Sequence, residues 1–313
     1  MRALLRREYG DASVVELGEI ETPTPGKGEV LLRVSAAGVD AGSWHFMTGE
    51  PRLMRLGTGV GSPRDPRLGI EVAGVVEALG PGVTTLSVGD TVFGVTNGSF
   101  ADAVVAKANK LAKLPAGFDP ADAAAAAVSG MTALDALAAA GPLAGKRVLV
   151  TGAGGGVGTF IVQLAVAAGA SVTGVCSTAK VSTVESLGAE VIDYTKGEPV
   201  GQWDVLFDTG GLRTLRALSD LLVRGGRALL IGGEGGRGPL GGFERQIFAP
   251  LTMAFSGRRF IAVMSSTTTA KLEKLAASGV RPVIERRYPL TEGAEALRHF
   301  ESGTVIGKLV LIP

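Results

Sequence analysis

The chain has 313 residues, 46% of them hydrophobic, which is enough to bury two cores. Its 31 basic residues nearly balance its 30 acidic residues, so charge gives no reason to expect a nucleic acid or an anionic membrane as a partner. The single cysteine, Cys176, excludes an internal disulfide and a thiolate zinc cluster. The N-terminal residues turn polar too soon for a secretory signal, and the alanine-rich run near Ala121 is interrupted by Asp122. We therefore expect a cytoplasmic protein that does not enter the membrane.

Short apolar runs alternate with turns over the first third of the chain. Those that predict strands cover residues 29–39, 69–80 and 89–95, and two more lie within residues 100–115. Gly, Pro, Asn or Asp residues separate them at intervals of roughly ten residues, which favours a small barrel or sandwich.

From about Asp119 the pattern becomes helical, because Asp119 and Pro120 are typical of an N-cap and a first helical turn. Six apolar strands then alternate with helices, which is typical of a doubly wound parallel sheet. The predicted strands are 147–152, 171–176, 190–194, 205–210, 227–233 and 260–265, and the helices between them include 158–169, 179–188 and 212–226. Residues 281–290 and 307–313 return to strand character and are expected to rejoin the first domain. The glycine-rich stretch 232–248 predicts a loop, either a gate for substrate or a plain connector.

A glycine-rich turn follows the first of the six strands and opens a helix. The sequence runs Ala153, Gly154, Gly155, Gly156, Val157, Gly158, an Ala-x-Gly-x-x-Gly form of the dinucleotide-binding fingerprint. Glycines allow a pyrophosphate to approach the backbone, and a helix N-terminus offers unpaired N–H groups and partial positive charge. The turn therefore predicts a dinucleotide site.

The end of the second strand indicates which dinucleotide binds. A carboxylate there would accept hydrogen bonds from the ribose 2′-hydroxyl of NAD, but this chain has Ser177 and Lys180 instead. Hydroxyls and an amine suit a 2′-phosphate, and Tyr194, at the end of the third strand, is expected nearby. Lys180 could also be only a solvated helix residue. We predict NADPH as the cofactor.

Several stretches resemble the medium-chain dehydrogenase/reductase superfamily, and within it the zinc-independent quinone oxidoreductase-like branch. They are "PGKGEVLLRVSAAGVDAGSWHFMTGEP", "LGIEVAGVVEALGPGVTTLSVGDTVFG", "AAAAAVSGMTALDAL", "VLVTGAGGGVGTFIVQLA", "LGAEVIDY" and "ESGTVIGKLVLIP". The resemblance implies an α/β protein with a discontinuous GroES-like β-barrel catalytic domain (1–118 and 270–313) and a Rossmann NADP-binding domain with a doubly wound parallel sheet (119–269). It also implies a homodimer that reduces quinones or α,β-unsaturated carbonyl compounds.

The chain departs from its zinc-dependent relatives where they bind metal. They carry a histidine where Ile70 stands before Glu71, and they carry a four-cysteine lobe that this chain lacks. Two histidines, His45 and His299, and one cysteine make no tetrahedral ligand set, so we predict no metal site. Without a Lewis acid, the easier acceptors are electron-poor molecules that spread the arriving charge themselves, such as quinones and enones. Glu71 is expected to be a structural polar anchor.

Three catalytic candidates follow from the resemblance. Asp40 stands where family members often have Asn, His45 stands where many quinone reductases have tyrosine, and Thr132 matches a position near the nicotinamide. His45 could give a hydrogen bond or a proton to a developing enolate, or it could be a packing or surface residue. Trp44 is expected to form an apolar wall for a flat substrate.

Two pairs at the ends of the last strands, Ile231–Gly232 and Val263–Met264, match family positions whose backbone meets the coenzyme. Two other functions remain open beside the quinone or enone reductase. One is an enoyl-thioester reductase, although the sequence shows no obvious basic patch for a carrier or coenzyme A. The other is a non-catalytic NADPH-binding sensor or structural protein. The apolar run "FIAVMS" predicts an exposed sheet edge at which two copies could pair.

Overall fold

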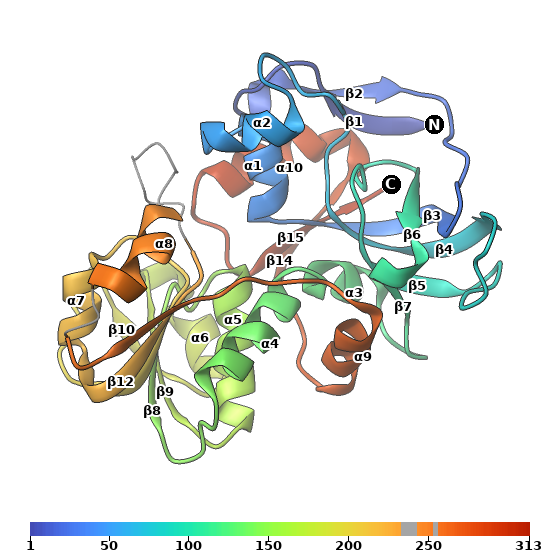
Figure 1. Ribbon diagram of the computed structural model, residues 1–313. Coiled ribbons are helices and arrows are strands. Elements are labelled where there is room, and N and C mark those ends of the chain that lie inside the picture. Colours follow the sequence, from blue (N-terminus) through green and yellow to red (C-terminus); the bar gives the residue numbers. More distant parts are fainter. Residues whose placement is uncertain (233–242, 253–255) are drawn as a thin grey trace. The chain divides into compact units, whose positions relative to one another are not determined.

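A computed structural model describes residues 1–232, 243–252 and 256–313. The chain forms two compact units (Figure 1). The strand-rich unit contains Met1–Met131 and Thr267–Pro313, and the parallel-sheet unit contains Thr132–Ser266. The C-terminal strands thus rejoin the first domain, as predicted.

The strand-rich unit contains the strands predicted for the first third of the chain. Its strands are β1 (Arg2–Arg6), β2 (Val15–Glu19), β3 (Glu29–Val39), β4 (Glu71–Leu79), β5 (Thr91–Val95), β6 (Ala103–Lys107), β7 (Leu111–Lys113), β14 (Ile284–Pro289) and β15 (Lys308–Ile312). Its helices are α1 (Ala41–Thr48), α2 (Arg55–Thr58), α3 (Pro120–Ala126), α9 (Thr269–Ala277) and α10 (Gly293–Glu301), with short 3-10 turns η1 (Ala12–Val14), η2 (Arg52–Met54), η3 (Ala108–Lys110) and η5 (Leu290–Glu292). Seven strands form one sheet along the path β14-β15-β3-β4-β5-β7, with β6 also paired to β3.

Strand β3 organises this unit because it pairs with β4, β6 and β15. Its first half alternates between buried and more exposed residues, whereas Ala36–Val39 is buried without interruption. Such a run is typical of a strand covered on both faces, and α3 packs against β3 and β4. The core of the unit includes Leu32, Phe100 and Tyr288.

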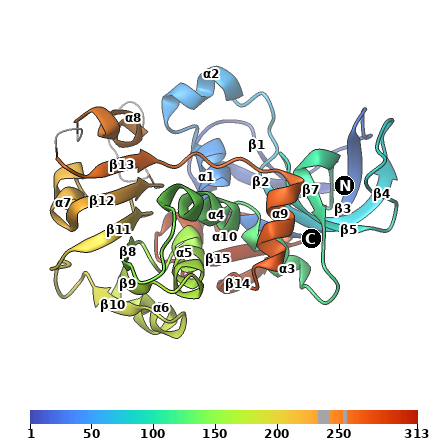
Figure 2. The same ribbon diagram turned by 60° about the horizontal axis from the view of Figure 1, so that its bottom comes forward.

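The unit boundaries differ from the predicted 118/119 and 269/270. Residues 119–131 stay with the strand-rich unit because the five alanines of α3 are buried there. At the other end, α9, orange in Figure 2, packs beside β7, and the Thr269 hydroxyl donates to the Leu111 carbonyl at 2.8 Å. The predicted N-cap is confirmed, since the Asp119 side chain accepts from the Ala121 amide.

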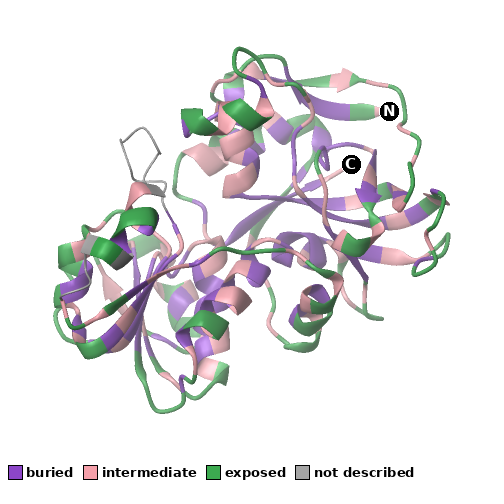
Figure 3. Ribbon diagram, viewed as in Figure 1, coloured by how far each residue is buried: buried purple, intermediate pink, exposed green. Residues whose placement is uncertain are grey.

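The parallel-sheet unit confirms all six predicted strands. They are β8 (Arg147–Thr151), β9 (Ser171–Cys176), β10 (Glu190–Asp193), β11 (Trp203–Asp208), β12 (Leu222–Leu230) and β13 (Arg259–Ala262), all parallel, in the order β10-β9-β8-β11-β12-β13. The helices are α4 (Ser129–Ala140), which begins in the strand-rich unit, α5 (Gly156–Ala167), α6 (Val181–Ser186), α7 (Leu215–Asp220) and α8 (Phe243–Thr252), with the 3-10 turn η4 (Thr178–Lys180). Helices α5 and α6 cover one face of the sheet and α7 and α8 the other (Figure 1), and the strands between them are largely buried (Figure 3).

Three predicted elements need correction. The helix expected over 212–226 ends at Asp220, and Leu222 already belongs to β12, which has an irregular register and a left-handed Gly225. The helix expected from Asp119 breaks at Val128, whose amide donates to the Glu71 side chain at 2.7 Å. Residues 243–248 of the expected loop are helical in α8, and its residues 233–242 lie outside the described part of the chain.

Within the described residues, no single helix is long and apolar enough to cross a membrane. Helices α3 and α4 pass the test of length and composition only as a pair, with a 47° bend between them.

Candidate coenzyme and active site

The glycine-rich turn lies at the carboxyl end of β8 and is shaped by two close backbone approaches. Gly152 has a left-handed φ of 71°, and a Cβ at this residue would lie 2.5 Å from the Thr209 hydroxyl oxygen. A Cβ on Gly158 would lie 2.1 Å from the Gly152 carbonyl oxygen, so only glycine lets α5 start this close to β8. Sequence analysis placed the first position at Ala153, which is buried, and missed the requirement at Gly152.

The centre of the turn is open. Gly155 is the N-cap of α5, and a Cβ there would come no nearer than 3.4 Å, to the Gly152 carbonyl. The first-turn amides of α5, on Gly156, Val157 and Gly158, have no acceptor inside the helix and carry the positive end of its dipole. Because the N-cap residue Gly155 has no side chain, the space beside these amides is open to a pyrophosphate. A side chain at Gly155 would fill part of that space. The residues present therefore fit a dinucleotide.

Lys180 lies directly over this turn. A Cβ on Gly154 would meet the Lys180 Cβ and Cδ atoms, each at 2.7 Å, so the glycine makes room for the lysine stem. The Lys180 amide donates to the Ser177 carbonyl at 2.9 Å, which closes η4 at the end of β9. The Tyr194 amide donates to the Cys176 carbonyl at 3.1 Å, and the Tyr194 side chain is exposed. Ser177, Lys180 and Tyr194 thus lie together, as predicted from the order of the strands.

The two C-terminal pairs lie at the same edge of the sheet, because all six strands run in one direction. The Ile231 and Gly232 amides both donate to the Asp208 carbonyl, at 3.0 and 3.1 Å, and the Val263 amide donates to the Leu230 carbonyl at 3.0 Å. The Met264 side chain is exposed. Coenzyme contact by these four residues stays a prediction.

A buried ion pair beside the turn was missed by sequence reasoning. Asp208, at the end of β11, accepts from the Thr151 hydroxyl at 2.6 Å and from the Arg245 guanidinium at 2.7 Å. Arg245 also donates to the Gly211 carbonyl at 2.6 Å, which ties α8 to the carboxyl edge of the sheet. In the sequence, Asp208 is noticeable only because it lies in one of the predicted strands. Nothing in the neighbouring sequence indicates that Arg245 contacts it.

In the strand-rich unit, Asp40 caps α1. Its Oδ1 accepts from the Ser43 amide at 3.0 Å and from the Ser43 hydroxyl at 2.5 Å. Its Oδ2 is buried and has no hydrogen-bond partner in the described part of the chain. A buried carboxylate oxygen without a donor is costly, but this atom is closed off from solvent, and its contact with a ligand stays a prediction.

His45 lies one turn further along α1. Its Nδ1 is 2.7 Å from the Glu50 carbonyl oxygen, and because a carbonyl only accepts, Nδ1 carries the hydrogen. A proton could therefore leave from Nε2 only when the ring is doubly protonated. Trp44 is partly buried against the core, and its indole N–H donates to Glu301 at 3.2 Å; its role as a substrate wall stays a prediction.

Glu71 is the polar anchor that sequence analysis expected. It is fully buried, and its carboxylate accepts from the Lys308 ammonium at 2.6 Å and from the Val128 amide. Burial, with the nearby Asp40 charge adding to it and Lys308 opposing it, raises the pKa of Glu71 to about 7. The pair joins β4 to β15.

Asp40 is the N-cap of α1 and His45 lies within that helix, whereas Thr132 lies on α4 as the first residue of the parallel-sheet unit. Among residues 1–232, 243–252 and 256–313, no three His, Cys, Asp or Glu side chains are grouped to hold a metal ion. Cys176 is buried at the end of β9, and burial raises the pKa of its thiol. His299 hydrogen-bonds through Nδ1 to the Tyr288 hydroxyl at 2.9 Å.

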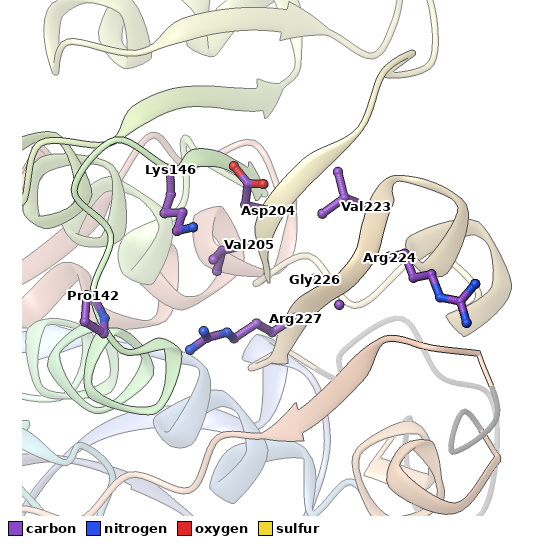
Figure 4. A pocket seen from close by; sticks show the side chains of 9 residues that line it. Pro142, Lys146, Asp204, Val205, Val223, Arg224, Gly226 and Arg227 are labelled. Carbon is purple, nitrogen blue, oxygen red and sulfur yellow. The ribbon is translucent and has the colours of Figure 1, made fainter.

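A hollow of about 180 Å³ lies at the opposite, amino edge of the parallel sheet (Figure 4). Its lining includes Lys146, Asp204 and Arg227, while the Arg224 guanidinium points away from these three (Figure 4). Because the glycine-rich turn lies at the carboxyl edge, this hollow is not part of the predicted coenzyme site.

Comparison with known proteins decides the family. A family described as the alcohol dehydrogenase GroES-like domain matches residues 26–116, and one described as zinc-binding dehydrogenase matches residues 187–311. The chain is 30% identical to a chloroplast envelope quinone oxidoreductase homolog from Arabidopsis thaliana, over 100% of this chain and 98% of that protein. The chain belongs to the medium-chain dehydrogenase/reductase superfamily, in its quinone oxidoreductase-like branch. It is an oxidoreductase, with a GroES-like domain and a Rossmann-like domain.

Other relatives of this dehydrogenase/reductase are named for different activities. An NADPH-dependent alkenal/one oxidoreductase from Arabidopsis thaliana is 29% identical over 100% of this chain and 80% of its own length. A mycocerosic acid synthase-like polyketide synthase from Mycolicibacterium smegmatis is 31% identical over 98% of this chain, which spans 15% of that synthase. These names describe those proteins.

Solved structures agree on the fold. The quinone oxidoreductase from Coxiella burnetii superimposes with a TM-score of 0.89 at 24% identity, covering 100% of this chain and 99% of that one. The Escherichia coli quinone oxidoreductase complexed with NADPH gives a TM-score of 0.84 at 24% identity, with complete coverage of this chain and 100% of that one. At this identity the likeness shows the fold alone.

Proposed function

We propose that this oxidoreductase uses NADPH to reduce a quinone or an α,β-unsaturated carbonyl compound, without a zinc ion. One observation carries the proposal: the Lys180 stem lies against Gly154, in a turn that fits a pyrophosphate. Ser177 belongs to the same segment. An amine and a hydroxyl at this point suit a 2′-phosphate.

The bound nicotinamide would supply the hydride, and the protein would hold the acceptor and place charge around it. Gly154–Gly158 would hold the pyrophosphate through backbone amides, and Ser177, Lys180 and Tyr194 would surround the 2′-phosphate. Ile231, Gly232, Val263 and Met264 would follow the coenzyme along the carboxyl edge of the sheet. Thr132 is proposed to lie near the nicotinamide.

On the substrate side, Asp40 Oδ2 would accept a hydrogen bond from the ligand. His45 would act through Nε2, as a donor to the substrate oxygen when the ring is protonated and as an acceptor otherwise. If His45 is the acid, His45→Phe lowers kcat. An unchanged kcat in His45→Phe would assign the histidine to packing.

The proposal of a zinc-independent reaction rests on what the donor side chains already do. Cys176 is buried in the parallel sheet, His45 Nδ1 is bonded to Glu50, and His299 is bonded to Tyr288. These three side chains offer no shared ligand set. Quinones and enones need less electrophilic assistance than a simple carbonyl, because conjugation spreads the arriving charge.

The test is an NADPH-oxidation screen over quinones, enones, aldehydes and enoyl thioesters, each with and without a chelator. We expect turnover with quinones or enones, no loss with chelator, and kcat/KM at least about tenfold higher with NADPH than with NADH. Lys180→Ala should remove most of that preference. Chelator-sensitive turnover, or equal use of the two coenzymes, would contradict the proposal.

A second candidate is an enoyl-thioester reductase, favoured by the match to a polyketide synthase segment. Turnover of enoyl thioesters well above that of free enones in the same screen would select it.

We also propose a cytoplasmic homodimer. Strand β13 is at one end of the six-stranded sheet, which leaves its outer edge available for pairing with a second copy. A molar mass near that of two chains in light scattering would support this, and a monomer would refute it.

A further inference from the structure

Asp193 stands in an unexpected place for an NADPH site. It ends β10 and pairs in register with Cys176, the last residue of β9, so it lies beside the Ser177–Lys180 segment. In nucleotide-binding sheets, a carboxylate in this region usually accepts hydrogen bonds from the ribose 2′-hydroxyl and repels a 2′-phosphate. Its presence conflicts with the proposed coenzyme unless something else engages it.

The Asp193 carboxylate is engaged on both oxygens. Thr178 donates its hydroxyl to Oδ2 at 2.6 Å, and Thr195 donates its hydroxyl and its amide to Oδ1 at 2.7 and 3.0 Å. The Lys196 ammonium lies 3.3 Å from Oδ2. A carboxylate has about four acceptor positions, and these donors fill them.

The environment keeps this group ionised. Hydrogen bonds from Thr178 and then Thr195 hold the pKa of Asp193 well below its usual range, against the opposing effect of burial. The two threonine hydroxyl oxygens are themselves 2.8 Å apart, so the cluster is compact. The Asp193 side chain is only 9% exposed, which leaves little access for another hydrogen-bond donor.

The cluster also fixes the neighbouring segment. Thr178 is the first residue of η4, so its bond to Asp193 ties η4 to the end of β10. Two residues later in the same turn, Lys180 lies against Gly154. The position of the lysine therefore depends on the anchor at Thr178.

We propose that Asp193 is a positioning residue that sets coenzyme specificity: it anchors the Ser177–Lys180 segment for a 2′-phosphate, while Thr178 and Thr195 withhold its carboxylate from the 2′-hydroxyl of NADH. The inference rests on the proposed NADPH preference. The choice between NADPH and NADH would then depend on hydrogen bonds between protein groups, in which the coenzyme takes no part.

The test is a binding titration with NADPH and with NADH on the purified protein, read by coenzyme fluorescence without substrate. The variant Thr178→Val/Thr195→Val keeps side-chain shape but removes both hydroxyls. We expect its Kd for NADPH to rise about tenfold and its Kd for NADH to fall, because the carboxylate becomes available. The matched control, Thr178→Ser/Thr195→Ser, keeps the hydroxyls and should keep the wild-type ratio of the two Kd values.

The variant Asp193→Ala separates two effects: the anchoring of the Ser177–Lys180 segment and the availability of the carboxylate to NADH. It should weaken NADPH binding about tenfold as well, but it should not improve NADH binding, since no acceptor is released. Melting temperatures identify any variant that fails to fold. If either the valine or the alanine variant does not fold, the test uses the one that does. A wild-type ratio near one would refute the NADPH preference. A wild-type preference that survives unchanged in a folded valine or alanine variant would refute the role of Asp193.

Discussion

The two units build their polar centres in different ways. In the parallel-sheet unit, one continuous segment from Gly152 to Gly158 forms the turn, and its backbone amides are the groups proposed to bind the coenzyme. In the strand-rich unit, Glu71 pairs with Lys308, which is 237 residues away in the sequence, and the contact is made by side chains. A backbone site depends on the absence of side chains, whereas a side-chain site depends on the fold that brings distant partners together.

The contrast predicts where substitutions act. Changes at the turn should affect coenzyme binding first, and changes at the Glu71 pair should affect stability first.

Lys308→Met should be the most destabilising single change. It leaves the fully buried Glu71 without its ammonium partner, and breaking one side of a buried pair costs about 3–5 kcal/mol. Chemical denaturation at pH 9, where the paired Glu71 carboxylate of the wild type is ionised, measures the free energy of unfolding. A loss below about 1 kcal/mol would show that the pair does not hold β4 to β15.

The same pair should give a pH-dependent stability. The pKa of Glu71 is about 7 when folded and 4.5 in its ordinary state, so the folded chain binds the extra proton between these values. Stability from this group is complete below pH 4.5 and is lost as pH rises to about 7, by about 3 kcal/mol in total. Unfolding free energies at pH 5 and pH 8 measure the loss. The double variant Glu71→Gln/Lys308→Met should lack it, and an equal slope in that variant would assign the effect elsewhere.

Gly158→Ala should act on the parallel-sheet unit, and mainly on coenzyme binding. Its Cβ would lie 2.1 Å from the Gly152 carbonyl oxygen, so the turn must shift. We expect a loss of coenzyme affinity of about tenfold or more, with about 1–3 kcal/mol of destabilisation. Gly197→Ala is the control, since its Cβ would meet nothing within 4 Å. Equal affinities in the two variants would remove the turn from the coenzyme site.

Asp40→Ala should have a small effect on stability and a larger one on catalysis. Loss of the N-cap of α1 costs about 1 kcal/mol, and Thr268→Ala, which removes the N-cap of α9, should cost a similar amount. Only Asp40→Ala should also lower kcat, because Oδ2 is the atom proposed to accept from the ligand. If both variants keep wild-type kcat, Asp40 is a cap and nothing more.

The sequence predicted what is local and missed what depends on distant contacts. All six parallel strands were found because apolar runs and glycines mark them, and the fingerprint located the turn. The segment at Leu222 was mistaken for helix because its apolar residues fit both periods. Arg245, Lys308 and the donors around Asp193 carry no local signal, since the contacts that define them form only when the strands pair. Asp193 was passed over because the carboxylate lies on β10, the third strand of this sheet along the chain, rather than on the second.

A crystal structure of the protein soaked with NADPH would test the central claim most directly. The account predicts the pyrophosphate against the amides of Gly154–Gly158 and the 2′-phosphate within hydrogen-bond reach of Lys180. Coenzyme bound elsewhere, or an empty turn at saturating NADPH, would contradict it.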